Sequence, residues 1–222
     1  MRRRLGFFTR LLDNVPAKQR YQLATEQIQH AERCGFDTAW IAQHHFHKDE
    51  GGLPSPLVFL AHAAAHTRTI RLGTAIITLP MENALRVAED AAVLDLLSDG
   101  RLEIGLGSGG TPDSFLPFGL TFAERGAAFA DNLHTLLSAW CGDSLGHPDN
   151  HLWPAAPQLA GRVWIATFSV EGAIRAGQGG HGLMLSRTQP RPAGQAERPL
   201  DALQNPLIDA YLAALPAGIE PR

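Results

Sequence analysis

The chain has 222 residues, of which 45% are hydrophobic and 18% are charged, which is enough to bury the core of one large domain. A net charge of -3 gives no basic excess, so we expect neither nucleic acid nor an anionic membrane as a partner. The sequence contains no run of about 18 apolar residues that would span a membrane. The apolar run behind the basic start is too short for a signal peptide, and we expect a cytoplasmic protein.

The cysteine content gives no sign of a disulfide framework. Cys34 and Cys141 have no second cysteine at CxxC spacing, which disfavours a thiolate metal site or a redox pair. We expect both to be free, buried thiols.

Strand-like and helix-like segments alternate along the chain. The first helix, for example, places Tyr21, Ala24, Ile28 and Ala31 on one face. The expected strands are 5–9, 38–43, 70–78, 102–106, 163–168 and 182–185, and the expected helices are 18–33, 57–66, 82–98, about 129–140, 171–177 and about 203–214.

The strands are continuous apolar runs, which indicates burial on both faces and therefore a parallel sheet covered by helices. About six β/α units fit either an open doubly wound sheet or a TIM-type (β/α) barrel. A complete barrel needs about 250 residues. A barrel here would be incomplete, with its C-terminal strands missing, within a single domain 1–222. Residues 187–206 contain four prolines, and we expect a mobile loop there.

Two adjacent histidines, His44 and His45, follow the expected strand 38–43. Ligands bind at the carboxyl ends of parallel strands, and alternation along a strand would turn only one of the two towards a ligand. Histidine is the side chain best suited to move a proton near neutral pH. The alternative is that both only cap or pack.

A metal site is a second interpretation of this region. His45, His47, Asp49 and Glu50 offer imidazole and carboxylate groups. Their spacing is not that of a known metal motif, so we expect no metal.

A glycine-rich run, 105–110, follows the fourth expected strand. Glycines let the backbone approach a ligand, and free N–H groups can hold an anion. The run matches neither a Walker loop nor a dinucleotide fingerprint. A tight turn alone is the alternative.

Ser169 precedes the expected helix 171–177. A hydroxyl and open N–H groups at a helix start can bind phosphate, but a serine there is equally an ordinary N-cap. In another helix, we expect Glu89 and Asp90 to pair with Arg86 or Arg101 in a structural role.

Several short motifs, taken together, resemble the bacterial luciferase-like flavin monooxygenases. Their order and spacing are similar to the luciferase alpha subunit up to about Gly109. The motifs are CGFDTxW at 34–40, HHF at 44–46, LGTAI at 72–76, LP at 79–80, RxAED at 86–90, LD at 94–95, SxGR at 98–101 and Gly105.

The resemblance implies a (β/α) barrel and a monooxygenase that uses reduced FMN, supplied by a separate flavin reductase. It implies that O2 reacts to a flavin C4a-hydroperoxide, which oxygenates a small organic substrate. His44 is the matching catalytic histidine. The resemblance also implies a homodimer through helices 57–66 and 84–97, whose alanine-rich faces would permit close packing.

The resemblance also implies a set of cofactor-binding residues. The 74–76 stretch would pack on the flavin ring, with a non-prolyl cis peptide, and 107–108 would also contact the cofactor. Ser169 and the helix start at Gly172 would bind the flavin phosphate. The full set is Thr74, Ala75, Ile76, Gly107, Ser108, Ser169 and Gly172.

Some positions depart from luciferase. Gln43 replaces a Glu, Gly107 and Ser108 replace a Cys and a phosphate-binding Arg, and Phe168 replaces a Glu. Losing the Arg removes a charge-assisted anchor. Two alternatives therefore stay open: a flavin-binding protein with a truncated barrel and no turnover, and a metal hydrolase on a similar barrel.

Overall fold

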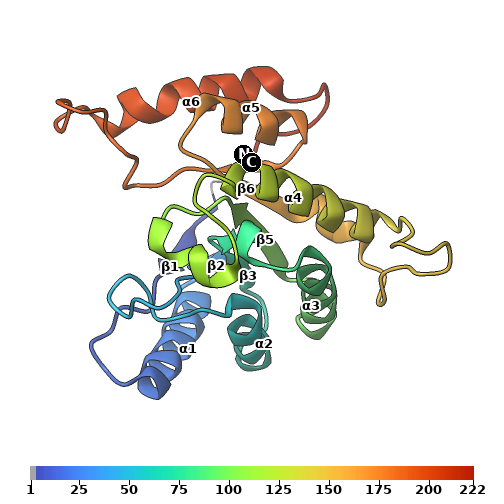
Figure 1. Cartoon of the computed structure of the whole chain (residues 1–222). Helices are drawn as coiled ribbons and strands as arrows, with labels where there is room; N and C mark the ends of the chain where they lie inside the picture. The colour runs from blue at the N-terminus through green and yellow to red at the C-terminus, as the bar shows by residue number, and fades with distance from the viewer. Residues whose placement is uncertain (1–3) are drawn as a thin grey trace.

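The computed structural model describes residues 4–222 and shows a parallel sheet curled into half of a barrel (Figure 1). Six strands, in the order β1-β2-β3-β5-β6-β7, turn through 199°, and the short β4 pairs with β5. Every paired strand runs parallel to its neighbour. The incomplete (β/α) barrel predicted from the sequence is therefore confirmed. The strands are Gly6–Thr9 (β1), Thr38–Ile41 (β2), Arg71–Thr74 (β3), Ile77–Thr78 (β4), Leu102–Gly107 (β5), Val163–Ala166 (β6) and Gly182–Met184 (β7).

Six α-helices accompany the strands, and α1, α2 and α3 stand side by side below the sheet in Figure 1. Within residues 4–222, none of them is long and apolar enough to cross a membrane. On α1, Ala24, Ile28 and Ala31 are buried, as the helical stripe predicted. The helices are Ala17–Arg33 (α1), Pro56–His66 (α2), Ala84–Leu97 (α3), Arg125–Cys141 (α4), Val170–Gln178 (α5) and Leu200–Ala214 (α6).

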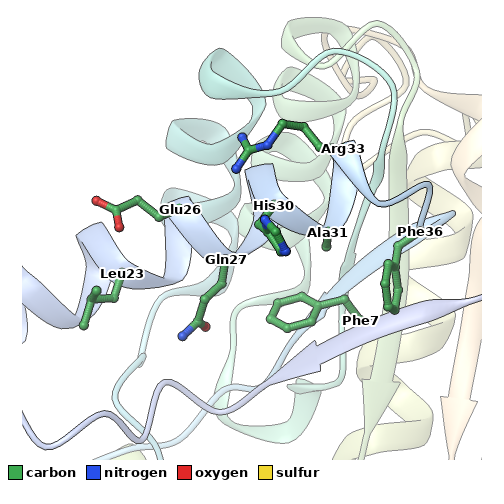
Figure 2. Close-up of a pocket in the computed structure, with 8 residues that line it drawn as sticks. All are labelled: Phe7, Leu23, Glu26, Gln27, His30, Ala31, Arg33 and Phe36. Carbon is green, nitrogen blue, oxygen red and sulfur yellow. The ribbon is translucent and has the colours of Figure 1, made fainter.

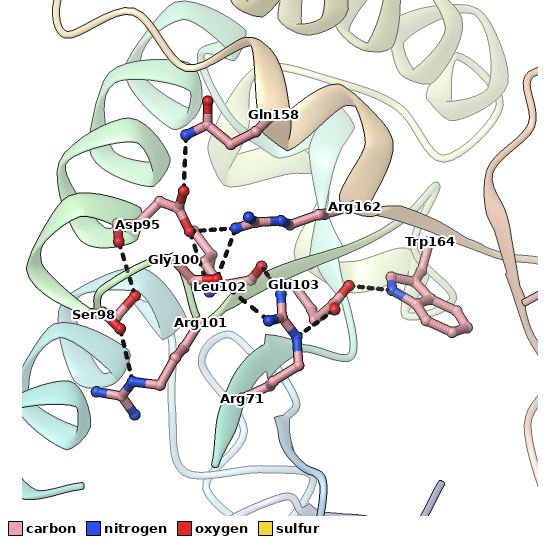
Figure 3. Close-up of polar contacts among 10 residues, drawn as sticks. All are labelled: Arg71, Asp95, Ser98, Gly100, Arg101, Leu102, Glu103, Gln158, Arg162 and Trp164. Atoms are coloured by element: carbon pink, nitrogen blue, oxygen red, sulfur yellow. Dashed lines mark hydrogen bonds and ion pairs between the residues drawn. The ribbon is translucent and has the colours of Figure 1, made fainter. Parts of the chain in front are cut away.

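Two tryptophans fill the inside of the half-barrel. The rings of Trp40 and Trp164 meet edge to face with their centres 5.5 Å apart. Glycines on neighbouring strands make room for them, because a Cβ on Gly73 or on Gly182 would lie 2.3 Å from the adjacent indole. The Trp164 Nε1 donates to Glu103, which also accepts from Arg71 (Figure 3).

The expected strand 70–78 is split. β3 ends at Thr74, and β4 begins at Ile77 and pairs with β5 alone. A cis peptide bond joins Ala75 to Ile76 between them, at the position that the family resemblance implied.

The loop expected over residues 187–206 is shorter than predicted, because α6 begins at Leu200 and contains Pro206. A proline inside a helix leaves the carbonyl four residues earlier without its usual donor. Here the Arg198 guanidinium donates to that carbonyl, on Ala202, at 3.2 Å. This local contact, four residues along the chain, replaces the donor that Pro206 lacks.

Both cysteines are exposed, so the expectation of buried thiols is wrong. Cys34 caps the end of α1, and Cys141 is the last residue of α4.

The two arginines considered for the α3 carboxylates have different roles. Arg86 is exposed and pairs with Glu89 and Asp90, which confirms one of the two predicted pairings. Arg101 is buried and donates instead to oxygens at the ends of α2 and α3 and just before β3; its bond to Ser98 is drawn in Figure 3. Those oxygens belong to Ala64, Thr67, Ile70 and Ser98.

We expect Arg101→Met to lower the free energy of unfolding by about 3 kcal/mol, because it leaves several buried oxygens without a donor. Arg86→Met is the matched control. Its ion pairs are exposed, and we expect a loss of about 1 kcal/mol or less. Urea unfolding of both variants checks this, and equal losses would contradict it.

Candidate functional site

The carboxyl ends of four neighbouring strands bring the predicted site residues to one rim of the half-barrel. His44 follows β2, Thr74 ends β3, Gly107 ends β5 and Ser169 follows β6. Because β2, β3, β5 and β6 are adjacent and parallel, these residues lie along the same edge.

The middle of the rim is apolar. The Ala75 N–H donates to the Ile41 carbonyl at 2.7 Å, which fixes the chain just beyond β3. A Cβ on Gly107 would lie 3.0 Å from the Ile76 side chain. Ile76 and Gly107, both predicted cofactor-binding residues, are therefore in contact. Ser108 follows directly and is half-buried.

Thr74 has a structural contact of its own. Its buried hydroxyl donates to the Gly105 carbonyl at 2.8 Å and accepts from the Gly105 N–H at 2.9 Å. These two bonds join β3 to β5 where β3 ends. The hydroxyl is thus already engaged within the sheet.

Gln43 turns towards the start of α3. Its Oε1 accepts from the Thr78 N–H at 2.7 Å, and its Nε2 donates to Glu82 at 2.7 Å. Burial raises the pKa of Glu82, and nearby Asp90 adds to this, while the Gln43 bond opposes it. Glu82 is a rim carboxylate that the sequence did not single out.

His44 lies under the loop that follows it. A Cβ on Gly51 would lie 2.4 Å from its ring, and its Nδ1 is 3.8 Å from Glu50 Oε2. Burial lowers the pKa of His44. The Arg10 and His45 charges lower this pKa further, while Glu50 opposes them. Arg10 also donates to the Glu50 carbonyl, so a cation and a carboxylate both flank this imidazole.

His45 has different surroundings. Its ring meets Phe118 edge to face, with ring centres 4.9 Å apart, and burial lowers its pKa. The Nε2 atom is buried without a hydrogen-bond partner.

Three buried polar atoms around the rim lack hydrogen-bond partners. They are Arg10 Nε, His45 Nε2 and Gln189 Oε1, and they follow the carboxyl ends of β1, β2 and β7. Leaving such an atom unpaired costs about 1–3 kcal/mol. Within residues 4–222, a fourth such atom, His181 Nδ1, lies before β7 at the opposite end, so three of the four gather at the rim where ligands bind in a parallel barrel.

At the far side of the rim, Ser169 is the N-cap of α5. Its Oγ accepts from the Gly172 N–H at 3.1 Å, which confirms the N-cap interpretation. Gly172 is tightly enclosed, because a Cβ there would lie 2.0 Å from the Thr167 hydroxyl. Glu171 places a carboxylate in the same turn, which opposes an anion. The phosphate role of this turn stays a prediction.

The metal interpretation finds little support. Within residues 4–222, no three His, Cys, Asp or Glu side chains are grouped so that they could hold a metal ion. The side chains of His45, His47, Asp49 and Glu50 therefore form no such group.

Two cavities lie away from the rim. One of ≈ 460 Å³ opens between β1 and α1 (Figure 2), and one of ≈ 220 Å³ lies inside the half-barrel near the amino ends of its strands. Neither is lined by a predicted site residue. The larger is lined by Phe7, Leu23, Glu26, Gln27, His30, Ala31, Arg33 and Phe36.

Comparison of the sequence with known proteins gives consistent matches. The chain is 36% identical to the uncharacterized protein y4vJ of Sinorhizobium fredii over 72% of this chain and 48% of the relative. It is 35% identical to the alkanal monooxygenase alpha chain of the Kryptophanaron alfredi symbiont, over 50% of this chain and 29% of the relative. The chain spans about half the length of the first curated relatives that it matches.

Solved structures share the fold. Monooxygenase RslO1 from Streptomyces bottropensis matches with a TM-score of 0.78 and 27% identity, over 99% of this chain and 68% of its own. Two structures at 18% identity show the fold alone. The oxygenating constituent of 3,6-diketocamphane monooxygenase from Pseudomonas putida, in complex with FMN, has a TM-score of 0.78 over 97% and 64% of the two chains. An F420-dependent secondary alcohol dehydrogenase has 0.74 over 100% and 68%.

The model of the family described as luciferase-like monooxygenase matches residues 3–203, which is most of the chain. The motifs around His44, Ile76 and Gly105 that suggested this family all lie within that match. The chain belongs to the luciferase-like monooxygenase family.

Proposed function

We propose that the protein is an FMN-dependent monooxygenase that uses reduced flavin to insert one oxygen atom from O2 into a small organic substrate. The observation that carries the proposal is the rim itself. An apolar floor at Ile76 and Gly107 is flanked by His44 and by the unpaired polar atoms of Arg10 and His45. Family membership supports a redox reaction at this rim.

The rim residues fit a flavin. Ala75, Ile76 and Gly107 would lie against the ring, because the missing side chain of Gly107 lets Ile76 pack closely on the backbone and form an apolar surface there. Ser169 and Gly172 would bind the phosphate, against the repulsion of Glu171. Thr74 and Ser108 would shape the same edge. FMN, when bound, supplies the oxygen chemistry, and the protein supplies position and proton transfer.

His44 is suited to that proton transfer. Burial favours its neutral form, which can accept a proton near neutral pH. Glu50 would act as a positioning residue, because a carboxylate near Nδ1 favours a proton on that nitrogen and leaves Nε2 free to act. In this proposal the enzyme works in the cytoplasm, where a separate flavin reductase supplies reduced FMN.

Titration of the purified protein with FMN and with F420, followed by fluorescence, tests the cofactor. We expect FMN to bind more tightly. Oxygen uptake with NADH and a flavin reductase then separates an enzyme from a flavin-binding protein without turnover. Tighter binding of F420, or no binding of FMN, would overturn the proposal.

We expect His44→Ala to bind FMN within about threefold of the wild type and to reduce product formed per O2 consumed by about 100-fold, with more free peroxide released. A linear aliphatic aldehyde serves as the test substrate. His47→Ala, an exposed neighbour, is the control. Unchanged coupling in the His44 variant would show that this residue is not the proton shuttle.

The positioning role of Glu50 predicts a change in the His44 pKa, which can be measured without an activity assay. Glu50→Gln removes the charge that raises the His44 pKa, so we expect that pKa to fall further below the ordinary histidine value. NMR titration of the imidazole resonances measures it. Asp49→Asn, in the same loop but exposed, should leave the His44 pKa unchanged, and an equal effect of both variants would refute the pairing.

We also propose that two copies pair through α2 and α3. The alanine-rich faces expected from the sequence do not form this interface, because most of the alanines on α2 and α3 are buried in the core. The outward faces carry larger apolar side chains, which favour association. They are Val58, Leu85, Val93, Leu96 and Leu97, all exposed.

We expect Leu97→Asp to weaken dimerisation at least tenfold, because it places a charge in the proposed apolar interface. Light scattering across a concentration series measures the change. Leu116→Asp, at an exposed leucine outside α2 and α3, should leave the mass unchanged. A monomeric wild type would remove the proposal.

A further inference from the structure

Two histidines form an unassigned pair on the outer surface of α2. His62 and His66 are one helical turn apart and both exposed, and their ring centres are 4.3 Å apart. Residues at i and i+4 share one face of a helix, so both imidazoles project in the same direction. Neither belongs to the rim that holds His44.

The tautomer of His66 is set by its own helix. Its Nδ1 lies 2.9 Å from the His62 carbonyl, and a carbonyl oxygen can only accept, so the ring proton sits on Nδ1. The lone pair of Nε2 is therefore directed away from the backbone. Histidines that bind metals usually donate their other nitrogen to a carbonyl or carboxylate in this way.

The backbone beneath the pair is also fixed. Gln29 on α1 donates to the His66 carbonyl at 2.9 Å, which holds the last turn of α2 in place. The positive charge of a cation is favoured near the C-terminus of a helix, where His66 lies. The His62 ring packs loosely beside Phe59, with ring centres 6.3 Å apart.

We propose that His62 and His66 form a two-histidine site for a divalent transition metal such as Ni²⁺, Cu²⁺ or Zn²⁺. Imidazole suits these ions, whose metal–nitrogen distances of about 2.0–2.1 Å are within reach of two rings this close. With two protein ligands, water fills the remaining positions, and the ion exchanges readily. The end of α2 lies near the amino ends of the strands, so the site is separate from the flavin rim.

Calorimetric titration of the metal-free protein with Ni²⁺ tests the site. We expect one ion per chain with micromolar affinity, and no binding of Mg²⁺, which prefers oxygen ligands. His62→Gln and His66→Gln should each weaken Ni²⁺ binding at least tenfold. His134→Gln is the matched control, since His134 is exposed on α4 without a histidine one turn away. Circular dichroism verifies that each variant is folded.

Because α2 also belongs to the proposed dimer surface, the titration is repeated on Leu97→Asp. Equal Ni²⁺ affinity in this variant supports a site made by one chain. Loss of Ni²⁺ binding in Leu97→Asp would overturn the proposal. It would also be overturned if His62→Gln and His66→Gln both kept Ni²⁺ binding while His134→Gln lost it. These outcomes do not depend on FMN or on oxygenase activity.

Discussion

The parallel alignment of the strands is the constraint on which the site depends. Each β/α unit returns the chain to the same end of the sheet, so every strand delivers its carboxyl end to one rim. Residues far apart in the sequence then come into contact, although no local sequence pattern predicts these contacts. Thr111 reaches Glu50, 61 residues away, at 3.4 Å, and Asn132 donates to the Glu82 carbonyl from 50 residues away.

At the opposite end of the half-barrel, large side chains line the smaller cavity of ≈ 220 Å³. Trp40 and Trp164 pack over glycines there, and the Arg222 guanidinium lies 5.5 Å from the centre of the Trp164 ring. Glu103 is satisfied by Arg71 and by the indole N–H. Of the buried polar atoms without a hydrogen-bond partner within residues 4–222, only His181 Nδ1 lies at this end, before β7, whereas three lie at the rim.

The architecture was predictable because it depends on patterns that are local in sequence. Continuous apolar runs required burial on both faces, and the serine at position 169 capped its helix as serine usually does. The errors concern side-chain placement that periodicity does not specify. Arg198 donates to the Ala202 carbonyl that Pro206 cannot serve, and both cysteines lie exposed at helix ends. The roles of Arg10 and Glu50 depend on a loop folding back over His44, which no periodicity reveals.

The histidine doublet is best understood from the unequal surroundings of its two rings. Burial lowers the pKa of His44, and the charges of Arg10 and Glu50 on either side of its ring act on that pKa in opposite directions. His45 has aromatic neighbours, and burial is the only cause that lowers its pKa. A proton shuttle needs the first kind of environment, because it must exist in both states at one pH. The second ring instead packs edge to face on Phe118, with its Nε2 buried and without a hydrogen-bond partner.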